Sequence, residues 1–238
     1  HKLTWPEIKQ LARDGHEIGN HSMSHYQLFK AKSRKDLEYE IITPIVIIKE
    51  KVGAKPETFC YPGNAKTPEI VKLVESVHAG STKGRRFFYG GDNFDLVKQQ
   101  KWLDEAITNG SEHQAMIHGI VPGGGGWKPF KNIAAFEEVL KNIKKHDNQL
   151  WVCTFAELCK YKKVRDSAKI TVTGDKGSTI FDVSSKYKFG ISLTVKISPC
   201  PAAVSAEQQG RRLNLIRKDN SGYIDVVPER GMVVLKGL

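Results

Sequence analysis

Hydrophobic residues recur every three or four positions up to Tyr161 and mostly every second position after it. The first spacing predicts amphipathic helices, because residues three and four apart share one helical face, and the second predicts strands. Helices are expected from Thr4 to Gly15 and over residues 33–52, 67–78 and 132–146. The predicted fold class is therefore an α/β domain followed by a smaller all-β domain.

Individual residues refine the prediction of the first two helices. Thr4, Pro6 and Glu7 form an N-terminal capping signature, and Gly15 ends the first helix. A short apolar segment then predicts a strand. In the second helix Pro44 has no amide hydrogen to donate, so we expect a bend there.

The last third of the chain has the pattern of short antiparallel strands separated by turns. The expected strands cover residues 170–173, 179–183, 191–197, 212–216, 223–227 and 232–235. This series predicts a sandwich-like domain over residues 164–238, after a first domain over residues 1–163. The second domain contains no histidine, so we do not expect it to be catalytic. A structural cap and a binding unit both remain open as its role.

Composition narrows the classes of partner. The chain has 238 residues, 39% of them hydrophobic, and no apolar run long enough for a membrane span. A net charge of +11 and a pI near 9.4 raise the question of a polyanion. The basic residues are dispersed and form no nucleic-acid-binding motif, so we expect no nucleic acid partner. The four cysteines show no zinc-type pairing.

The candidate chemistry lies in the histidines. His21 and His25 are four residues apart, a spacing that would place both imidazoles on one face of a helical turn and let them share a divalent ion. His118 ends a short apolar strand pattern far downstream. Histidine pairs at this spacing also arise by chance on solvated surfaces, and a metal site needs a third ligand.

Several blocks of sequence, taken in order, resemble one known family. They are GHEIGNHSMSH at residues 15–25, FCYPG at 59–63, MIHG at 116–119 and WVCTFAEL at 151–158. Over about residues 3–165 this order is similar to the polysaccharide deacetylases of carbohydrate esterase family 4, the NodB-homology domain. The resemblance implies a distorted (β/α) barrel. It also implies a hydrolase that uses a divalent metal, zinc or alternatively cobalt or nickel, to cleave the carbon–nitrogen (non-peptide) or ester bonds of acetyl groups on a polysaccharide.

The resemblance assigns roles to the three histidines. His21 and His25 would hold the metal, and a water bound to that metal would attack the acetyl carbonyl and release acetate. His118 would act as general acid and protonate the departing sugar atom. The alternative for His118 is a histidine packed in the core.

A turn and a glycine-rich loop would contribute to the same site. The resemblance makes the amide of Gly63 a donor to the oxyanion, within a substrate-binding turn that includes Tyr61 and Pro62. Trp127, after four glycines, could stack on a sugar face, and a solvent-exposed flexible loop is its alternative. Cys60 stands where the family has arginine, so the role of that arginine would have to pass to another residue.

The family's opening strand, Phe-Asp-Asp-Gly, supplies the general base and the third metal ligand, and no such strand occurs in this sequence. We therefore expect the chain to be part of a longer polypeptide, with a barrel that is incomplete at its N-terminus. The alternative is a non-catalytic glycan-binding relative without the aspartates. The expected partner is an acetylated polysaccharide or oligosaccharide. The expected location is secreted, periplasmic or at the cell envelope of a bacterium.

Overall fold

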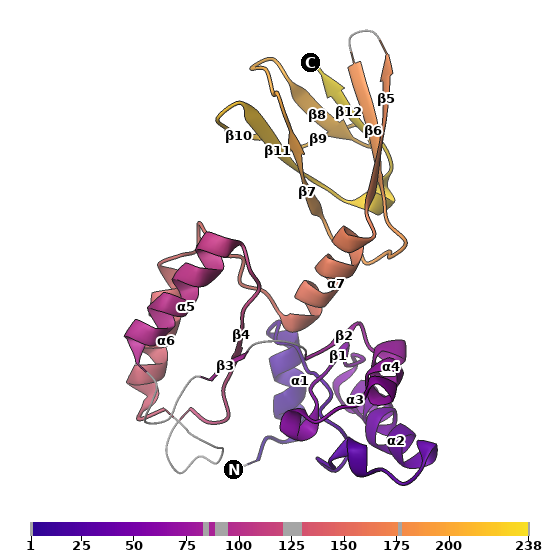
Figure 1. Cartoon of the computed structure of the whole chain (residues 1–238), viewed down its shortest axis with the longest axis vertical. Coiled ribbons are helices and arrows are strands. Elements are labelled where there is room, and N and C mark those ends of the chain that lie inside the picture. The colour runs from indigo at the N-terminus through magenta and orange to yellow at the C-terminus, as the bar shows by residue number, and fades with distance from the viewer. Residues whose placement is uncertain (1, 83–85, 89–94, 121–129, 176–177, 238) are drawn as a thin grey trace. The chain divides into compact units, whose positions relative to one another are not determined.

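The structure, a computed structural model, describes residues 2–82, 86–88, 95–120, 130–175 and 178–237 (Figure 1). The chain divides into two compact units, His1–Thr154 and Phe155–Leu238. The predicted domains were residues 1–163 and 164–238. Helix α7 (Phe155–Asp166) accounts for the difference, because all of it falls in the second unit and its Tyr161 packs against the hydrophobic core of that unit.

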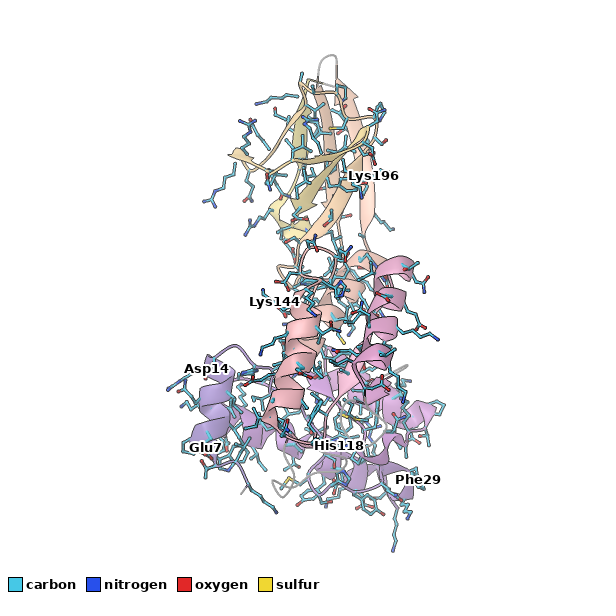
Figure 2. All side chains as sticks on the ribbon, turned by 90° about the vertical axis from the view of Figure 1, so that its left-hand side faces the viewer. Glu7, Asp14, Phe29, His118, Lys144 and Lys196 are labelled. Atoms are coloured by element: carbon cyan, nitrogen blue, oxygen red, sulfur yellow. The ribbon has the colours of Figure 1, made fainter. Side chains whose placement is uncertain are left out.

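The first unit begins with helices whose ends follow local signals. They are α1 (Trp5–Arg13), α2 (Arg34–Ile41), α3 (Thr43–Val52) and α4 (Pro68–Val77). The predicted capping box of α1 is confirmed, because the backbone N–H and the hydroxyl of Thr4 each donate to Glu7 Oε2 at 2.7 Å. Figure 2 shows Glu7 and Asp14 toward the two ends of this helix.

The prediction of one bent helix over residues 33–52 is wrong in detail, because the segment forms two helices. The helical run breaks at Ile42, and Pro44 lies in the first turn of α3. Proline is tolerated there because the first amides of a helix have no partner within it. Helix α3 ends at Gly53, whose φ of 91° lies in the left-handed region.

Parallel strand pairing connects the next segments. Strand β1 (Thr58–Phe59) pairs with β2 (Gly80–Ser81), and Asn20 forms a parallel bridge to Phe59 on the other edge of β1. Two short 3-10 helices, η1 (Leu28–Lys30) and η2 (Pro62–Asn64), lie in the connections. The core that supports this region is a cluster of apolar side chains from the helices and β1. Its buried members are Leu28, Leu37, Ile41, Phe59, Tyr61, Ile70, Leu73 and Val74.

A second parallel pair lies later in the first unit. Strand β3 (Arg86–Phe88) pairs with β4 (Gln114–Met116), and the helices of this region are α5 (Leu96–Asn109) and α6 (Ile133–Lys144). Helix α5 was not predicted from the sequence. A buried glutamine, Gln99, takes a core-facing position on this helix, where it donates to the Val139 carbonyl at 3.1 Å. This polar residue weakens the hydrophobic period.

The first unit is mixed α/β, as predicted, but its described strands do not close into a barrel. They are two or three residues long and form two separate parallel pairs. Closure requires a continuous ring of paired strands, which the described part of this unit does not contain. None of the described helices is long and apolar enough to cross a membrane.

The second unit contains two antiparallel sheets, in the orders β10-β11-β7 and β5-β6-β12-β8-β9. The strands are β5 (Lys169–Asp175), β6 (Ser178–Ser184), β7 (Leu193–Ile197), β8 (Ser205–Gln208), β9 (Arg211–Arg212), β10 (Ile216–Lys218), β11 (Ser221–Val226) and β12 (Val233–Lys236). Alternate residues of both sheets fill one core, to which β6, β7, β11 and β12 contribute. The predicted alternation is confirmed. Strand β8 was not predicted, because its sequence, Ser-Ala-Glu-Gln, is largely polar.

Candidate functional site

The histidine pair lies on a loop, and the prediction of a helical turn is wrong. His21 follows the bridge at Asn20, and the segment to His25 contains no helix. Two of its residues, Ser22 (φ 68°) and His25 (φ 59°), adopt the left-handed conformation. The loop nevertheless brings the pair together, since the ring centroids of His21 and His25 lie 4.9 Å apart in an edge-to-face arrangement. Both side chains are exposed.

A buried carboxylate holds this loop in place of helical hydrogen bonds. Glu40, on α2, is only 6% exposed. Its Oε2 accepts the amides of Met23 at 3.1 Å and Ser24 at 3.0 Å, and its Oε1 accepts the Ser24 hydroxyl at 2.6 Å. Hydrogen bonds to a charged acceptor are about twice as strong as neutral ones, so Glu40 is well suited to fix the loop between the histidines.

Sequence reasoning missed Glu40, although a signal was present. Glu40 falls on the same helical face as Leu37 and Ile41, and all three are buried. A carboxylate within an apolar helical stripe is costly to bury unless several donors satisfy it. That pattern points to a polar contact with a distant segment, but it does not identify the segment.

Asn20 and His78 fix the other end of the loop. The Asn20 side chain is 1% exposed, donates to the Ile41 carbonyl at 2.8 Å and accepts the Ser22 amide at 3.0 Å. His78 Nδ1 lies 3.0 Å from the Val74 carbonyl, so Nδ1 carries the hydrogen, and Nε2 accepts from Asn20 Nδ2 at 3.2 Å. Burial lowers the pKa of His78, which favours this neutral form.

A backbone carbonyl orients His21. Its Nδ1 lies 2.7 Å from the carbonyl oxygen of Cys60, directly after β1. Because a carbonyl only accepts, Nδ1 carries the hydrogen, and the lone pair of the ring lies on Nε2. This is how metal-binding histidines are commonly oriented, with one nitrogen donating to a carbonyl and the other available to a metal.

The turn at Tyr61, Pro62 and Gly63 follows β1 immediately. Tyr61 is 1% exposed, and its ring packs edge to face on Phe59 with centroids 5.2 Å apart. Burial raises the pKa of the Tyr61 phenol. Pro62 is buried, and Gly63 has a φ of 59°, a conformation that glycine adopts at little cost. The side chains of Tyr61 and Pro62 thus face the core, and Gly63 lies at the surface of the turn.

His118 lies within the described residues, and Trp127 does not. His118 lies in a bend two residues after β4, and its side chain is exposed, so it is not a core histidine. Figure 2 shows it within the first unit. Trp127 and the preceding glycines lie outside the described residues.

A complete metal site is not found among the residues that the structure describes. No three His, Cys, Asp or Glu side chains gather there closely enough to hold an ion. His21 and His25 supply two nitrogen donors, and neutral imidazole is a good ligand for zinc and neighbouring metals. The donor set fits a divalent metal in kind, but a third protein ligand has to be added.

The first third of the chain is similar to a known protein family. The model of the polysaccharide deacetylase family matches residues 2–79, which include the histidine pair and the turn at Gly63. The resemblance predicted from the sequence is therefore confirmed over these residues.

One curated relative spans nearly the whole chain. A gellan lyase from a Bacillus species is 20% identical over 269 aligned positions, which cover 94% of this chain. The chain spans only 11% of the length of that relative.

Solved structures similar to this chain include a deacetylase and a domain of a xylanase. A peptidoglycan deacetylase from Bacillus subtilis, in a mutant form, has a TM-score of 0.44 at 18% identity, over 68% of this chain and 73% of its own. The carbohydrate esterase domain of a multidomain xylanase, from the hindgut metagenome of Trinervitermes trinervoides, has a TM-score of 0.46 at 16% identity, over 68% of this chain and 72% of its own.

Proposed function

We propose that this chain, whose residues 2–79 match the polysaccharide deacetylase family, is part of a hydrolase that removes N- or O-acetyl groups from a polysaccharide and releases acetate. One observation carries the proposal. Within the matched segment, His21 and His25 lie side by side on a loop that Glu40 and Asn20 hold from opposite ends. Surface histidines without a binding role would not need two buried polar side chains to position them.

We include a divalent metal in the proposal, with zinc as first choice and cobalt or nickel as alternatives. His21 would bind through Nε2, since its Nδ1 is engaged by the Cys60 carbonyl, and His25 would be the second ligand. A carboxylate outside the described residues would be the third. When bound, such an ion polarises a carbonyl and acidifies water.

The chain's own residues would complete the chemistry. The amide of Gly63 would donate to the oxygen that gains negative charge, and Tyr61 and Pro62 would shape that substrate-binding turn from beneath. His118 would give a proton to the departing sugar nitrogen or oxygen, and its exposure is consistent with access to a substrate. Trp127 would stack on a sugar ring.

The finer features of fold and location belong to the same proposal. We infer a distorted (β/α) barrel of the NodB type for the first domain and a β-sandwich formed by the two sheets of the second unit. The substrate class favours a secreted, periplasmic or envelope-associated bacterial protein. An acetylated polysaccharide or oligosaccharide is the proposed partner.

Acetate release from an acetylated oligosaccharide tests the proposal. With the full-length polypeptide, His21→Ala and His25→Ala should abolish metal binding and activity, and His118→Ala should lower kcat by about 10²–10⁴ while metal affinity persists. His16→Ala changes an exposed histidine that precedes the loop of residues 20–25, and as the control it should leave both unchanged.

A second candidate, a non-catalytic glycan-binding relative, remains because the described residues contain no third metal ligand. In that case the wild-type protein would release no acetate with any of the three metals, and all three alanine variants would keep their affinity for the glycan. That pair of results would refute the hydrolytic proposal.

A further inference from the structure

Most of the chain's net positive charge lies in the second unit. Residues 155–238 include 15 Lys and Arg and 8 Asp and Glu, so this unit carries +7 of the chain's net charge of +11. The excess favours an anionic partner for this unit. Net charge alone does not locate a binding site, so the site has to be found from the positions of individual side chains.

A cavity of about 370 Å³ lies at one end of the five-stranded sheet. Its walls come from the hairpin of β8 and β9 and from the 3-10 helix η3 (Pro228–Arg230). The lining residues are Gln208, Gln209, Arg211, Leu213 and Arg230. The volume lies in the usual range of small-ligand sites.

A buried amide joins the two walls of this cavity. Gln208 is 4% exposed, and its Nε2 donates to the carbonyls of Val227 at 3.0 Å and Gly231 at 2.8 Å, which flank η3. The hairpin that carries Arg211 is thereby fixed to the turn that carries Arg230. The backbones of both arginines are set in advance, which lowers the entropy lost when a ligand binds.

The two arginines are not neutralised within the described part of the chain. No ion pair involves Arg211 or Arg230 there, and neighbouring carboxylates are engaged elsewhere. Glu207 pairs with Lys236 at 3.0 Å, and Glu229 accepts the Gly190 amide at 3.0 Å. Among the residues that the structure describes, neither guanidinium group at this cavity is therefore engaged in an ion pair.

We propose that this cavity binds a carboxylate-bearing sugar unit of a polysaccharide. Arg211 and Arg230 would bind the carboxylate, since the planar guanidinium matches its two oxygens. Leu213, which packs on the core of the second unit, would offer an apolar surface to the sugar ring. The choice of a polysaccharide over another anion rests on the proposed function. The inference that the cavity binds an anion rests on the two arginines alone.

The hairpin provides a matched control. In the antiparallel register Arg211 lies opposite Gln208, and Arg212 lies opposite Glu207. Adjacent residues of a strand point to opposite faces, so Arg212 points away from the cavity that Arg211 lines. Arg212→Gln thus removes the same charge from the same hairpin without touching the site.

Calorimetric titration of the full chain with an oligogalacturonide tests the proposal. Arg211→Gln and Arg230→Gln should each weaken binding about tenfold or more, whereas Arg212→Gln should change it less than twofold. A neutral oligosaccharide of equal length should bind at least tenfold more weakly than the oligogalacturonide. Inorganic phosphate at the same molar concentration should not displace the oligogalacturonide.

Three results would overturn the proposal. They are equal losses in Arg211→Gln and Arg212→Gln, equal affinity for the neutral oligosaccharide, and full displacement by phosphate, which would indicate a site for small anions only. Acetate release is measured in parallel on the full-length polypeptide. Uronate binding without acetate release would count against the proposed hydrolase alone, and the converse against the cavity alone.

Discussion

Glu40 shows how one side chain can set the geometry of a site that it does not enter. Its carboxylate accepts three donors from residues 23 and 24, between the two histidines. The left-handed residues Ser22 and His25 are unfavourable by themselves, and this contact offsets their cost.

Replacing Glu40 by glutamine should loosen the loop. An amide retains one acceptor oxygen but turns an NH₂ group toward a donor, so we expect a loss of about 2 kcal/mol in unfolding free energy, the scale of a charged hydrogen bond. Affinity for Zn²⁺ or Co²⁺, measured by competition with a chelating dye, should fall about 10–100-fold.

Glu38→Gln is the matched control for this change. Glu38 lies on the same helix and pairs with Arg34 at 2.8 Å, but half of its side chain is in solvent. Exposed pairs contribute about 0–1 kcal/mol, so stability should change little and metal affinity not at all. Equal effects of the two substitutions would contradict the role given to Glu40.

His78 predicts a pH dependence of stability. Burial lowers its pKa in the folded chain below the ordinary value of 6.5, so the unfolded chain binds more protons once the pH falls below that value. The contribution of His78 is therefore complete above about pH 7 and is lost as the pH falls toward the folded-state pKa. Urea unfolding at pH 7.5 and 5.5 should show a larger loss for the wild type than for His78→Gln.

An exposed histidine provides the control for His78→Gln. His16→Gln changes an exposed side chain, and its loss between the two pH values should match that of the wild type. If His78→Gln also behaved like the wild type, the buried neutral imidazole would not be the source of the effect.

At the scale of elements, β11 depends on a glycine at its point of closest packing. A Cβ added to Gly222 would lie 2.6 Å from Cys200 Sγ and 2.7 Å from Leu215 Cδ1. Gly222→Ala should therefore destabilise the second unit by about 1–3 kcal/mol, the usual cost of overpacking. Differential scanning calorimetry of the full chain should show a lower melting temperature for one transition only, because the two units have separate cores.

Gly174→Ala provides the reference for this substitution. Gly174 lies on β5, and a Cβ there would meet no atom within 4 Å. We expect its melting profile to equal or slightly exceed that of the wild type. A loss as large as that of Gly222→Ala would show that the strand position, and not the contact with Cys200 and Leu215, is responsible.

Elements differed in how far local sequence could predict them. The capping box of α1 and the alternation of β6, β7, β11 and β12 depend on neighbours in the chain, and both are confirmed. Helix α5 and strand β8 place glutamines, Gln99 and Gln208, at buried positions. Those glutamines donate hydrogen bonds to carbonyls that are distant in the sequence, so no local pattern predicts that they are buried.

At the scale of the whole molecule, local sequence identifies the histidines, whereas contacts between distant segments determine how they are held. The sequence by itself determined the family resemblance and named His21 and His25 as candidate metal ligands, because both inferences rest on residue types in a fixed order. It also determined the change from a helical to an alternating pattern in the last third of the chain.

Only the tertiary structure decided the form of the site and its supports. It replaced the expected helical turn by a loop, because Glu40 and Asn20 supply hydrogen bonds that a helix would otherwise make internally. It also placed Arg211 and Arg230 at one cavity, nineteen positions apart in the sequence. Hydrogen bonds and charges between distant segments depend on where the chain returns in space, and local periodicity carries no information about that return.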